Sequence, residues 1–437
     1  MKRSQAQRRA LIVAWICLAL LLFNLWALSR PWMFEAEPLF TWRKGPLVKE
    51  SCPYSSFHAA RYLWPAVALM LDGYIAALLG WLRVQRRLSR SLAGKLGPVV
   101  IAATLLVLFG GAELGVRAAI RHYQFNQYRP DPELYWFNRP NLRDQSDDTD
   151  RVPHSTNAWG FRGAEEIGPR EPGELRVLIV GDSSTFGLGV PDPAVYGQVM
   201  RRRLEAATGR KVTIIDTGSP GHTSYQGWLL WERFAPLFAP DFLVWAFNND
   251  SCLDMIAEQD RLDRPAAVIA LQRVLYHSDL YLMAEQVALD FLRRSDRARF
   301  QQTYPSDKSG WVKRVSFRDY QDYLARFDRS ARDRCAWPIF VRMPLNRRSV
   351  RDHEIYSTSF DDAYRDYLSE DFCVAEGRLC LDAERRFNGL TEPGLFLPDH
   401  LFHPSIRGHE LLGEWLAQLV LERGLTEPPS PACAEER

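Results

Sequence analysis

Residues 176–190, RVLIVGDSSTFGLGV, decide the expected fold. The run 176–180 is apolar except at its first residue, and it leads directly into Gly181, Asp182 and Ser183. An uninterrupted apolar run of this length is typical of a strand that is buried on both faces. A Gly-Asp-Ser tripeptide after such a run predicts a tight turn, which its polar side chains can cap as a helix begins.

Similar strand-like runs alternate with helical patterns along the rest of the chain. Alternation of this kind predicts an α/β fold, a three-layer α/β/α sandwich with a parallel, flavodoxin-like sheet. Active sites in such folds collect at the carboxyl ends of the strands. The further strand-like runs are 212–216, 242–247 and 338–341, and the helical patterns are 198–207, 225–238 and 408–423.

Residues suited to ester chemistry follow these runs. Ser183 follows the first run, where its hydroxyl can act as a nucleophile. Gly221 follows the second, and a glycine lets a backbone N–H approach an oxyanion closely. Asn248 and Asn249 follow the third, and a side-chain amide there can donate to the same anion. Because the carboxyl ends of parallel strands share one edge of a sheet, we expect these groups to lie close together.

Three histidines lie near the C-terminus, just before and at the start of the last helical pattern. We expect His403 to take the serine proton and Asp399 to orient its ring, the division of labour of a Ser-His-Asp triad. Its rivals are His400, which we expect to face solvent, and His409, which we expect to pack at the start of the helix. A base of this kind must be deprotonated, so activity should fall below about pH 6–7.

Together these motifs resemble the SGNH, or GDSL-type, hydrolase family over nearly all of residues 150–420. The resemblance implies an α/β serine esterase with Ser183, His403 and Asp399 as the triad and with Ser183, Gly221 and Asn249 as oxyanion donors. Independently of the resemblance, no C-x-x-C pair or histidine cluster suggests a metal and no glycine-rich phosphate loop appears, so no cofactor is expected. The matching motifs are Gly181-Asp182-Ser183, Gly221, Asn249-Asp250 and His403-Pro404 with Gly408-His409, and Trp159-Gly160-Phe161-Arg162-Gly163 is similar to a segment of membrane-anchored bacterial members.

Two positions depart from the pattern of that family. Phe247 stands where the family usually has a glycine, two residues before the asparagine, which leaves Asn248 open as the donor in place of Asn249. The family's aspartate usually precedes the histidine by three residues, whereas Asp399 precedes His403 by four. The role of Asp399 is therefore less secure than that of His403.

The charge of the 437-residue chain is distributed unevenly. Its formal net charge is +2, but residues 1–120 carry a net +10 and residues 121–437 a net −8. This asymmetry argues against one uniform globular body, and the composition is not that of a disordered chain or a disulfide-dense miniprotein. The acidic part offers no basic patch for nucleic acid.

The basic N-terminal part contains three candidate membrane spans, residues 10–28, 63–82 and 96–116. Residues 10–28 carry no charge, and Lys2, Arg3, Arg8 and Arg9 before them should keep the N-terminus in the cytoplasm. A cleaved signal peptide is the alternative interpretation of the first span. Three spans would place the remaining chain on the outer, periplasmic face of a multi-pass inner-membrane protein.

The expected organisation is a membrane segment over 1–120, a linker with surface loops over 121–174, a hydrolase domain over 175–424 and a flexible tail over 425–437. A helical insertion is expected at about 251–330, either as a lid or as a packed excursion over the sheet edge. Cys373 and Cys380 are seven residues apart and could form a disulfide in an oxidising compartment.

The leading functional hypothesis is a membrane-anchored esterase that removes O-acyl groups, O-acetyl above all, from an envelope glycan or lipid. An O-acyltransferase using the same serine is an alternative, since only the acceptor differs, and it would suit a membrane-embedded acyl-transfer or export partner. A non-catalytic envelope scaffold is a further alternative, since a fold does not imply a function.

Overall fold

The computed structural model describes residues 72–80, 82–83, 90–121, 127–143, 152–254, 257, 265–282, 284–285, 311–347, 361–374, 377–398 and 400–426. The chain divides into two compact units. One comprises residues 1–126 and 267–303, and the other comprises residues 127–266 and 304–437. We describe each unit by itself.

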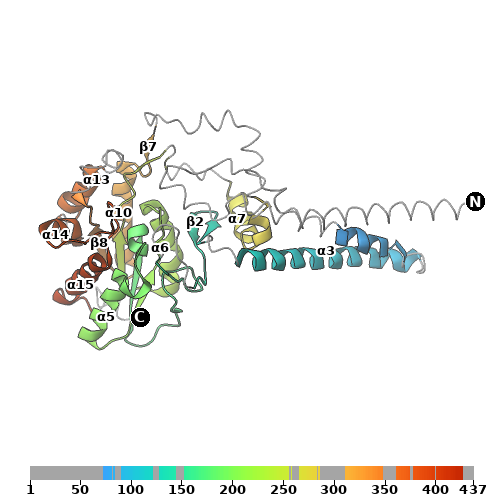
Figure 1. The fold of residues 1–437 in the computed structure, drawn as a ribbon, viewed down its shortest axis with the longest axis horizontal. Helices are drawn as coiled ribbons and strands as arrows, with labels where there is room; N and C mark the ends of the chain where they lie inside the picture. Colours follow the sequence, from blue (N-terminus) through green and yellow to red (C-terminus); the bar gives the residue numbers. More distant parts are fainter. Residues whose placement is uncertain are drawn as a thin grey trace, which may run out of the picture. The chain divides into compact units, whose positions relative to one another are not determined.

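A five-stranded parallel sheet forms the centre of the second unit (Figure 1). Its order is β4-β3-β5-β8-β9, which is the doubly wound order of flavodoxin-like folds. The predicted parallel sheet is therefore confirmed, and the four predicted strands form with ends shifted by at most one residue. The strands are β3 (Leu175–Gly181), β4 (Val212–Asp216), β5 (Phe242–Ala246), β8 (Trp337–Arg342) and the unpredicted β9 (Leu379–Asp382).

Helices cover both faces of this sheet because the strand side chains point alternately to the two sides. Leu178 and Val180 of β3 pack in one core cluster with α6 (Ser224–Phe238) and α10 (Phe317–Asp333). Val177 and Ile179 pack in the other cluster with α5 (Tyr196–Thr208) and α15 (Ile406–Glu422), which lie beside each other in Figure 1. The three-layer arrangement that the apolar runs predicted is thus present.

A hairpin precedes the sheet within the second unit. It pairs β1 (Tyr128–Asp131) with β2 (Tyr135–Asn138) in antiparallel register. Phe137 of the hairpin and Phe161 farther along are buried in the same core cluster as α6. Part of the described chain between 127 and 174, which the composition suggested as a linker with surface loops, thus contributes apolar side chains to the core beside the sheet.

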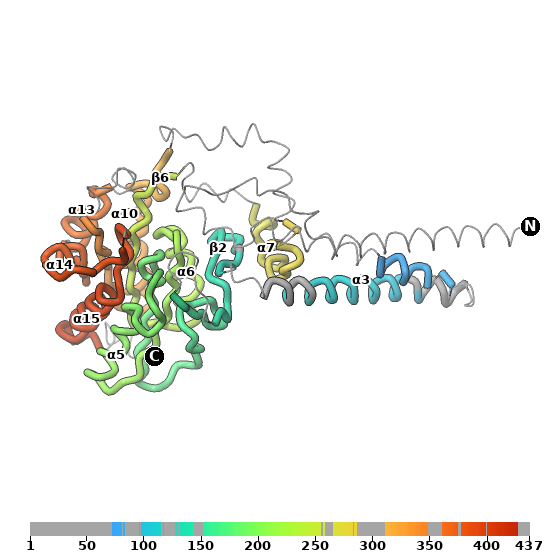
Figure 2. Tube along the Cα trace, in the orientation of Figure 1, coloured from blue at the N-terminus to red at the C-terminus, as the bar shows by residue number. Residues whose placement is uncertain are grey.

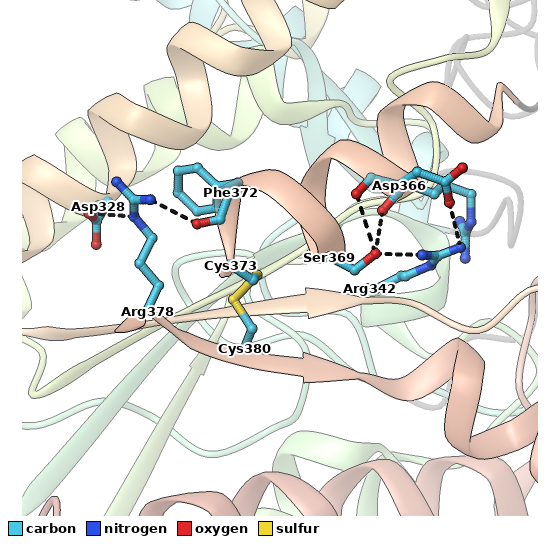
Figure 3. Close-up of a disulfide and its surroundings, with 9 residues drawn as sticks. Asp328, Arg342, Asp366, Ser369, Phe372, Cys373, Arg378 and Cys380 are labelled. Atoms are coloured by element: carbon cyan, nitrogen blue, oxygen red, sulfur yellow. Dashed lines mark hydrogen bonds and ion pairs between the residues drawn. A yellow bond between two sulfur atoms is a disulfide. The ribbon is translucent and has the colours of Figure 1, made fainter. Parts of the chain in front are cut away.

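The Cys373–Cys380 disulfide is confirmed, and Figure 3 shows it joining the end of η4 to β9. Beside it, Arg378 pairs with Asp328 of α10 at 3.0 Å. Cys335 is also disulfide-bonded, a pairing that the spacing did not suggest. The shorter elements of this unit are α4 (Ser183–Phe186), η2 (Asp192–Ala194), β6 (Leu253–Asp254), β7 (Val312–Lys313), α13 (Asp362–Asp366), η4 (Tyr367–Phe372) and α14 (Ala383–Gly389).

The first unit contains the long helix α3 (Arg90–Arg121) and α7 (Ala266–Leu275), both drawn along the Cα trace in Figure 2. The Glu113 carboxylate of α3 accepts hydrogen bonds from the backbone N–H groups of Asp279 and Leu280, 2.9 and 3.0 Å away. The described residues 267–282 and 284–285, which are part of the expected helical insertion, therefore cluster with α3.

The structure describes the three predicted membrane spans to different extents. The span 10–28 lies outside them, the span 63–82 is described only from residue 72, and 96–116 lies within α3. In the part of the chain that the structure describes, no helix combines the length and the apolar character needed to cross a membrane. The predicted flexible tail is described only at residues 425 and 426, and the rest of it lies outside the described residues.

Candidate active site

Ser183 lies at the carboxyl end of β3, as the first residue of α4. The turn before it requires glycine, because a Cβ on Gly181 would lie 1.9 Å from Thr185 Oγ1 and 2.5 Å from the Ala246 carbonyl oxygen. Thr185 Oγ1 donates to that same oxygen at 3.0 Å. The short helix is therefore held tightly against the end of β5, at the switch point of the strand order where ligands bind in such folds.

Asp182 ties the ends of β3 and β5 together. Its buried carboxylate accepts hydrogen bonds from the backbone N–H of Ser184, as the cap of α4, and from that of Asn248, at 2.9 and 2.6 Å. Burial raises the pKa of Asp182 to about 6, against the effect of these two hydrogen bonds, which lower it. The motif pointed to Ser183 as the reacting group, and the structure gives Asp182 the task of holding the turn.

His403 lies in the loop before α15, and its Nε2 is 2.7 Å from Ser183 Oγ. Ser184 Oγ donates to the Phe402 carbonyl at 2.9 Å, which fastens this loop to α4. Burial, followed by the charges of His400 and His409, lowers the pKa of His403 to about 3. His403 is therefore neutral at pH 7, the form that accepts a proton, and the acid limit of activity should lie below the pH 6–7 that the sequence predicted.

The two rival histidines occupy different surroundings. His409 is buried, accepts the backbone N–H of Tyr196 at 3.2 Å through Nδ1 and stacks on the Tyr196 ring, so the expectation that it packs at the helix start is confirmed. His400 is half-buried, with Nδ1 2.7 Å from His403 Nδ1. His400 was expected to face solvent, and in the structure it is partly exposed and also contacts His403. The predicted orienting residue, Asp399, lies outside the described residues.

The loop after β4 carries Gly221, whose φ of +80° lies in the left-handed region that favours glycine. The hairpin strand β2 holds this loop. The Trp136 indole N–H donates to the Pro220 carbonyl at 3.0 Å, and Asn138 donates to the Gly218 carbonyl at 2.7 Å. The aromatic-rich run of β2 was not assigned to the site from the sequence, since nothing local connects it with a loop some 80 residues away.

The two asparagines after β5 make different contacts. Asn249 Nδ2 donates to the carbonyl of His222, the residue directly after Gly221, at 3.2 Å. The Asn248 side chain instead accepts from Arg365 Nη1 at 2.8 Å and lines a cavity of about 20 Å³ whose lining does not include Ser183. These contacts favour Asn249 over Asn248 as the amide donor beside Gly221.

Arg162, in the segment 159–163, supports the chain that follows the serine helix. Its buried guanidinium donates to Asp192 Oδ1 at 2.7 Å and to the Val190 carbonyl. Its backbone N–H donates to the carbonyl of Asp216 at the end of β4, at 3.0 Å. The family-like motif therefore has a structural explanation, because one residue links the chain after Ser183 to the strand before Gly221.

The site as a whole brings a serine hydroxyl against a neutral histidine and links an asparagine amide to a glycine-containing loop, an arrangement that suits acyl transfer. The structure directly joins Ser183 with His403 and links Asn249 to the loop of Gly221. Among the described residues, no group of three or more histidine, cysteine or acidic side chains is arranged to hold a metal ion.

No family model and no curated protein matches the chain. Among solved structures, the lipase/acylhydrolase from Enterococcus faecalis is similar at 17% identity and a TM-score of 0.36, covering 57% of this chain and 96% of that one. An α/β hydrolase from the metagenome of Lake Arreo, Spain, is similar at 15% identity and a TM-score of 0.35, covering 58% of this chain and 96% of that one. A variant of an acetyl xylan esterase from Geobacillus stearothermophilus is similar at 14% identity and a TM-score of 0.34, covering 56% of this chain and 94% of that one. Likenesses this weak carry no conclusion about activity, which depends on the geometry of the site.

Proposed function

We propose that this protein is a serine hydrolase of carboxylic esters that removes O-acyl groups, O-acetyl above all, from a cell-envelope glycan or lipid. The observation that carries the proposal is the 2.7 Å contact between Ser183 Oγ and His403 Nε2 at the carboxyl edge of a parallel sheet. A buried, neutral histidine in hydrogen-bond contact with a serine hydroxyl is the arrangement that activates a serine nucleophile.

The mechanism follows from the positions of these groups. His403 Nε2 accepts the Ser183 proton while Oγ forms a bond to the ester carbonyl carbon, and the carbonyl oxygen becomes an oxyanion. The backbone N–H groups of Ser183 and Gly221 and the Asn249 amide stabilise that charge. The alcohol leaves with the proton from His403, and water then cleaves the acyl-enzyme through the same base.

Membrane anchoring belongs to the proposal and is supported by the sequence. The uncharged run 10–28 follows four basic residues, so the N-terminus should remain cytoplasmic and the catalytic unit should lie on the outer, periplasmic face of the inner membrane. The Cys373–Cys380 disulfide suits that oxidising side. The net −8 of residues 121–437 repels anionic polymers at long range, which favours neutral acylated glycans or lipids as substrates.

A fluorophosphonate probe tests the proposal on the full chain in detergent. We expect the probe to label the wild type and the Ser278→Ala variant, which loses a serine hydroxyl of the other unit but keeps the nucleophile. The Ser183→Ala variant should be neither labelled nor able to cleave an aryl acetate. Equal labelling of wild type and Ser183→Ala would refute the enzyme, and acyl delivery to an added oligosaccharide in preference to water would identify an O-acyltransferase.

A further inference from the structure

The His400–His403 pair adds a feature that the proposed reaction does not by itself require. His403 Nε2 lies 2.7 Å from Ser183 Oγ, and His403 Nδ1 lies 2.7 Å from His400 Nδ1. The two imidazole planes are inclined by 52° with their centroids 4.9 Å apart, so the rings meet through their nitrogens and not through parallel faces. Two successive contacts therefore connect Ser183 to His403 and His403 to His400.

The chemistry of the base determines where the protons lie in these two contacts. To accept the Ser183 proton, Nε2 of His403 must be unprotonated, so the neutral ring carries its hydrogen on Nδ1. That N–H then donates to His400 Nδ1, which must itself be an unprotonated acceptor. His400 consequently holds its own hydrogen on Nε2, and both rings are neutral in the reactive state.

We propose that His400 is the positioning residue of the base, so that the site works as a Ser183–His403–His400 triad. The inference rests on the proposed function and deepens it. His400 stands three residues before His403, and its backbone N–H donates to the Leu397 carbonyl at 3.1 Å. The Leu397 N–H in turn donates to the His403 carbonyl at 3.0 Å, so both histidines are held by one compact turn.

A neutral imidazole supports the base differently from a carboxylate. A carboxylate would stabilise the imidazolium that forms on His403 through its charge, whereas neutral His400 contributes a hydrogen bond and orients the ring. No carboxylate contacts the His403 ring among the residues that the structure describes. The titratable groups that act on this ring are His400 and His409, with the Ser183 hydroxyl facing it from α4.

This arrangement makes the proton state of His400 a condition for activity. A protonated imidazole has donors at both nitrogens and no acceptor. His403 Nδ1–H would then lose its partner, and the base would be free to rotate away from Ser183. A carboxylate placed at position 400 should raise the pKa of His403 through its charge and move the acid limit of kcat/KM to higher pH.

The test compares His400→Ala and His400→Asp with the wild type, using full-length protein, an aryl acetate and pH profiles. We expect His400→Ala to lower kcat on the order of 10²-fold with little change in KM, because general-base catalysis is worth about 10²–10⁴-fold. His400→Asp should restore much of kcat and move the acid limit upward by about one pH unit or more. His277→Ala, in the other unit, should leave activity unchanged.

Several outcomes would overturn the triad. A His400→Ala enzyme with kcat within about threefold of the wild type would refute it, as would a His400→Asp enzyme with an unshifted acid limit. If Asp399→Ala loses activity while His400→Ala does not, the orienting role belongs to Asp399. Thermal unfolding verifies that each variant is folded, and fluorophosphonate labelling of the wild type separates failure of this inference from failure of the proposed function.

Discussion

Replacing Gly221 with alanine tests whether its backbone N–H meets the oxyanion. The residue has a φ of +80°, and an added Cβ would lie 3.1 Å from Trp136 Cζ2. That ring cannot withdraw freely, because its N–H donates to the Pro220 carbonyl at 3.0 Å. The loop must shift instead, and it carries the Gly221 N–H away from the carbonyl oxygen of the substrate.

The magnitude has two separable parts. A left-handed conformation costs an alanine about 1–2 kcal/mol, which appears as lost stability. Loss of one oxyanion donor lowers turnover by about 10²–10³-fold, or 2.7–4 kcal/mol of transition-state stabilisation. Gly173 is a matched control, since its φ is +78° and a Cβ there would meet nothing within 4 Å. Gly173→Ala should lose comparable stability and keep its activity.

The assay combines urea unfolding of the two variants with their kcat/KM for an aryl acetate. We expect both variants to lose similar stability and only Gly221→Ala to lose activity. If Gly221→Ala keeps activity within about threefold of the wild type while losing stability like Gly173→Ala, its N–H is not an oxyanion donor. Equal losses of activity in both variants would mean that backbone strain alone explains the effect.

Two further predictions concern buried arginine contacts. Arg162→Lys keeps the charge but not the forked contacts to Asp192 and the Val190 carbonyl, so it should lose about 1–3 kcal/mol of stability and part of kcat. The control Arg407→Lys, at the exposed pair with Glu392, should change neither stability nor kcat. An unaltered urea midpoint in Arg162→Lys would contradict the role of the guanidinium. Burial raises the pKa of Glu384, but the charge of Arg365 and hydrogen bonds from three arginines outweigh it and lower that pKa to about 2. Glu384→Gln should therefore lose about 3 kcal/mol of folding stability at pH 7. The folded-state pKa is depressed, so this difference from the wild type should be complete above pH 4.5 and should shrink as the pH falls toward 2; a difference that does not vary with pH would refute the assignment.

The strands were predictable where the sequence pattern is local and strong. The runs that became β3, β5 and β8 are almost uninterruptedly apolar, because both faces of a central parallel strand are covered. The edge strand β9 escaped, since it has four residues and alternates between buried and half-buried positions. Helix α10 has a clear amphipathic pattern and could have been assigned from it.

The candidate site was predictable in its residues more than in its contacts. Ser183, Gly221, Asn249 and His403 were each singled out by the motif they occupy, and the structure gathers them at the carboxyl edge of the sheet. The supporting contacts of Trp136, Asn138 and Arg162 were not foreseen. Each joins segments that are tens of residues apart, and neither spacing nor periodicity encodes such a pairing.

The sequence by itself determined the fold class, the edge of the sheet that carries the chemistry, and the serine and histidine at its centre, because apolar periodicity and turn residues act over a few neighbours. Only the tertiary structure showed which described group meets the far side of the base. The sequence predicted Asp399, which lies outside the described residues, as the orienting residue, and the structure places His400 Nδ1 2.7 Å from His403 Nδ1. Hydrogen bonding depends on the direction in which each side chain leaves a packed loop, and that direction is set by distant contacts such as the one from Ser184 to Phe402.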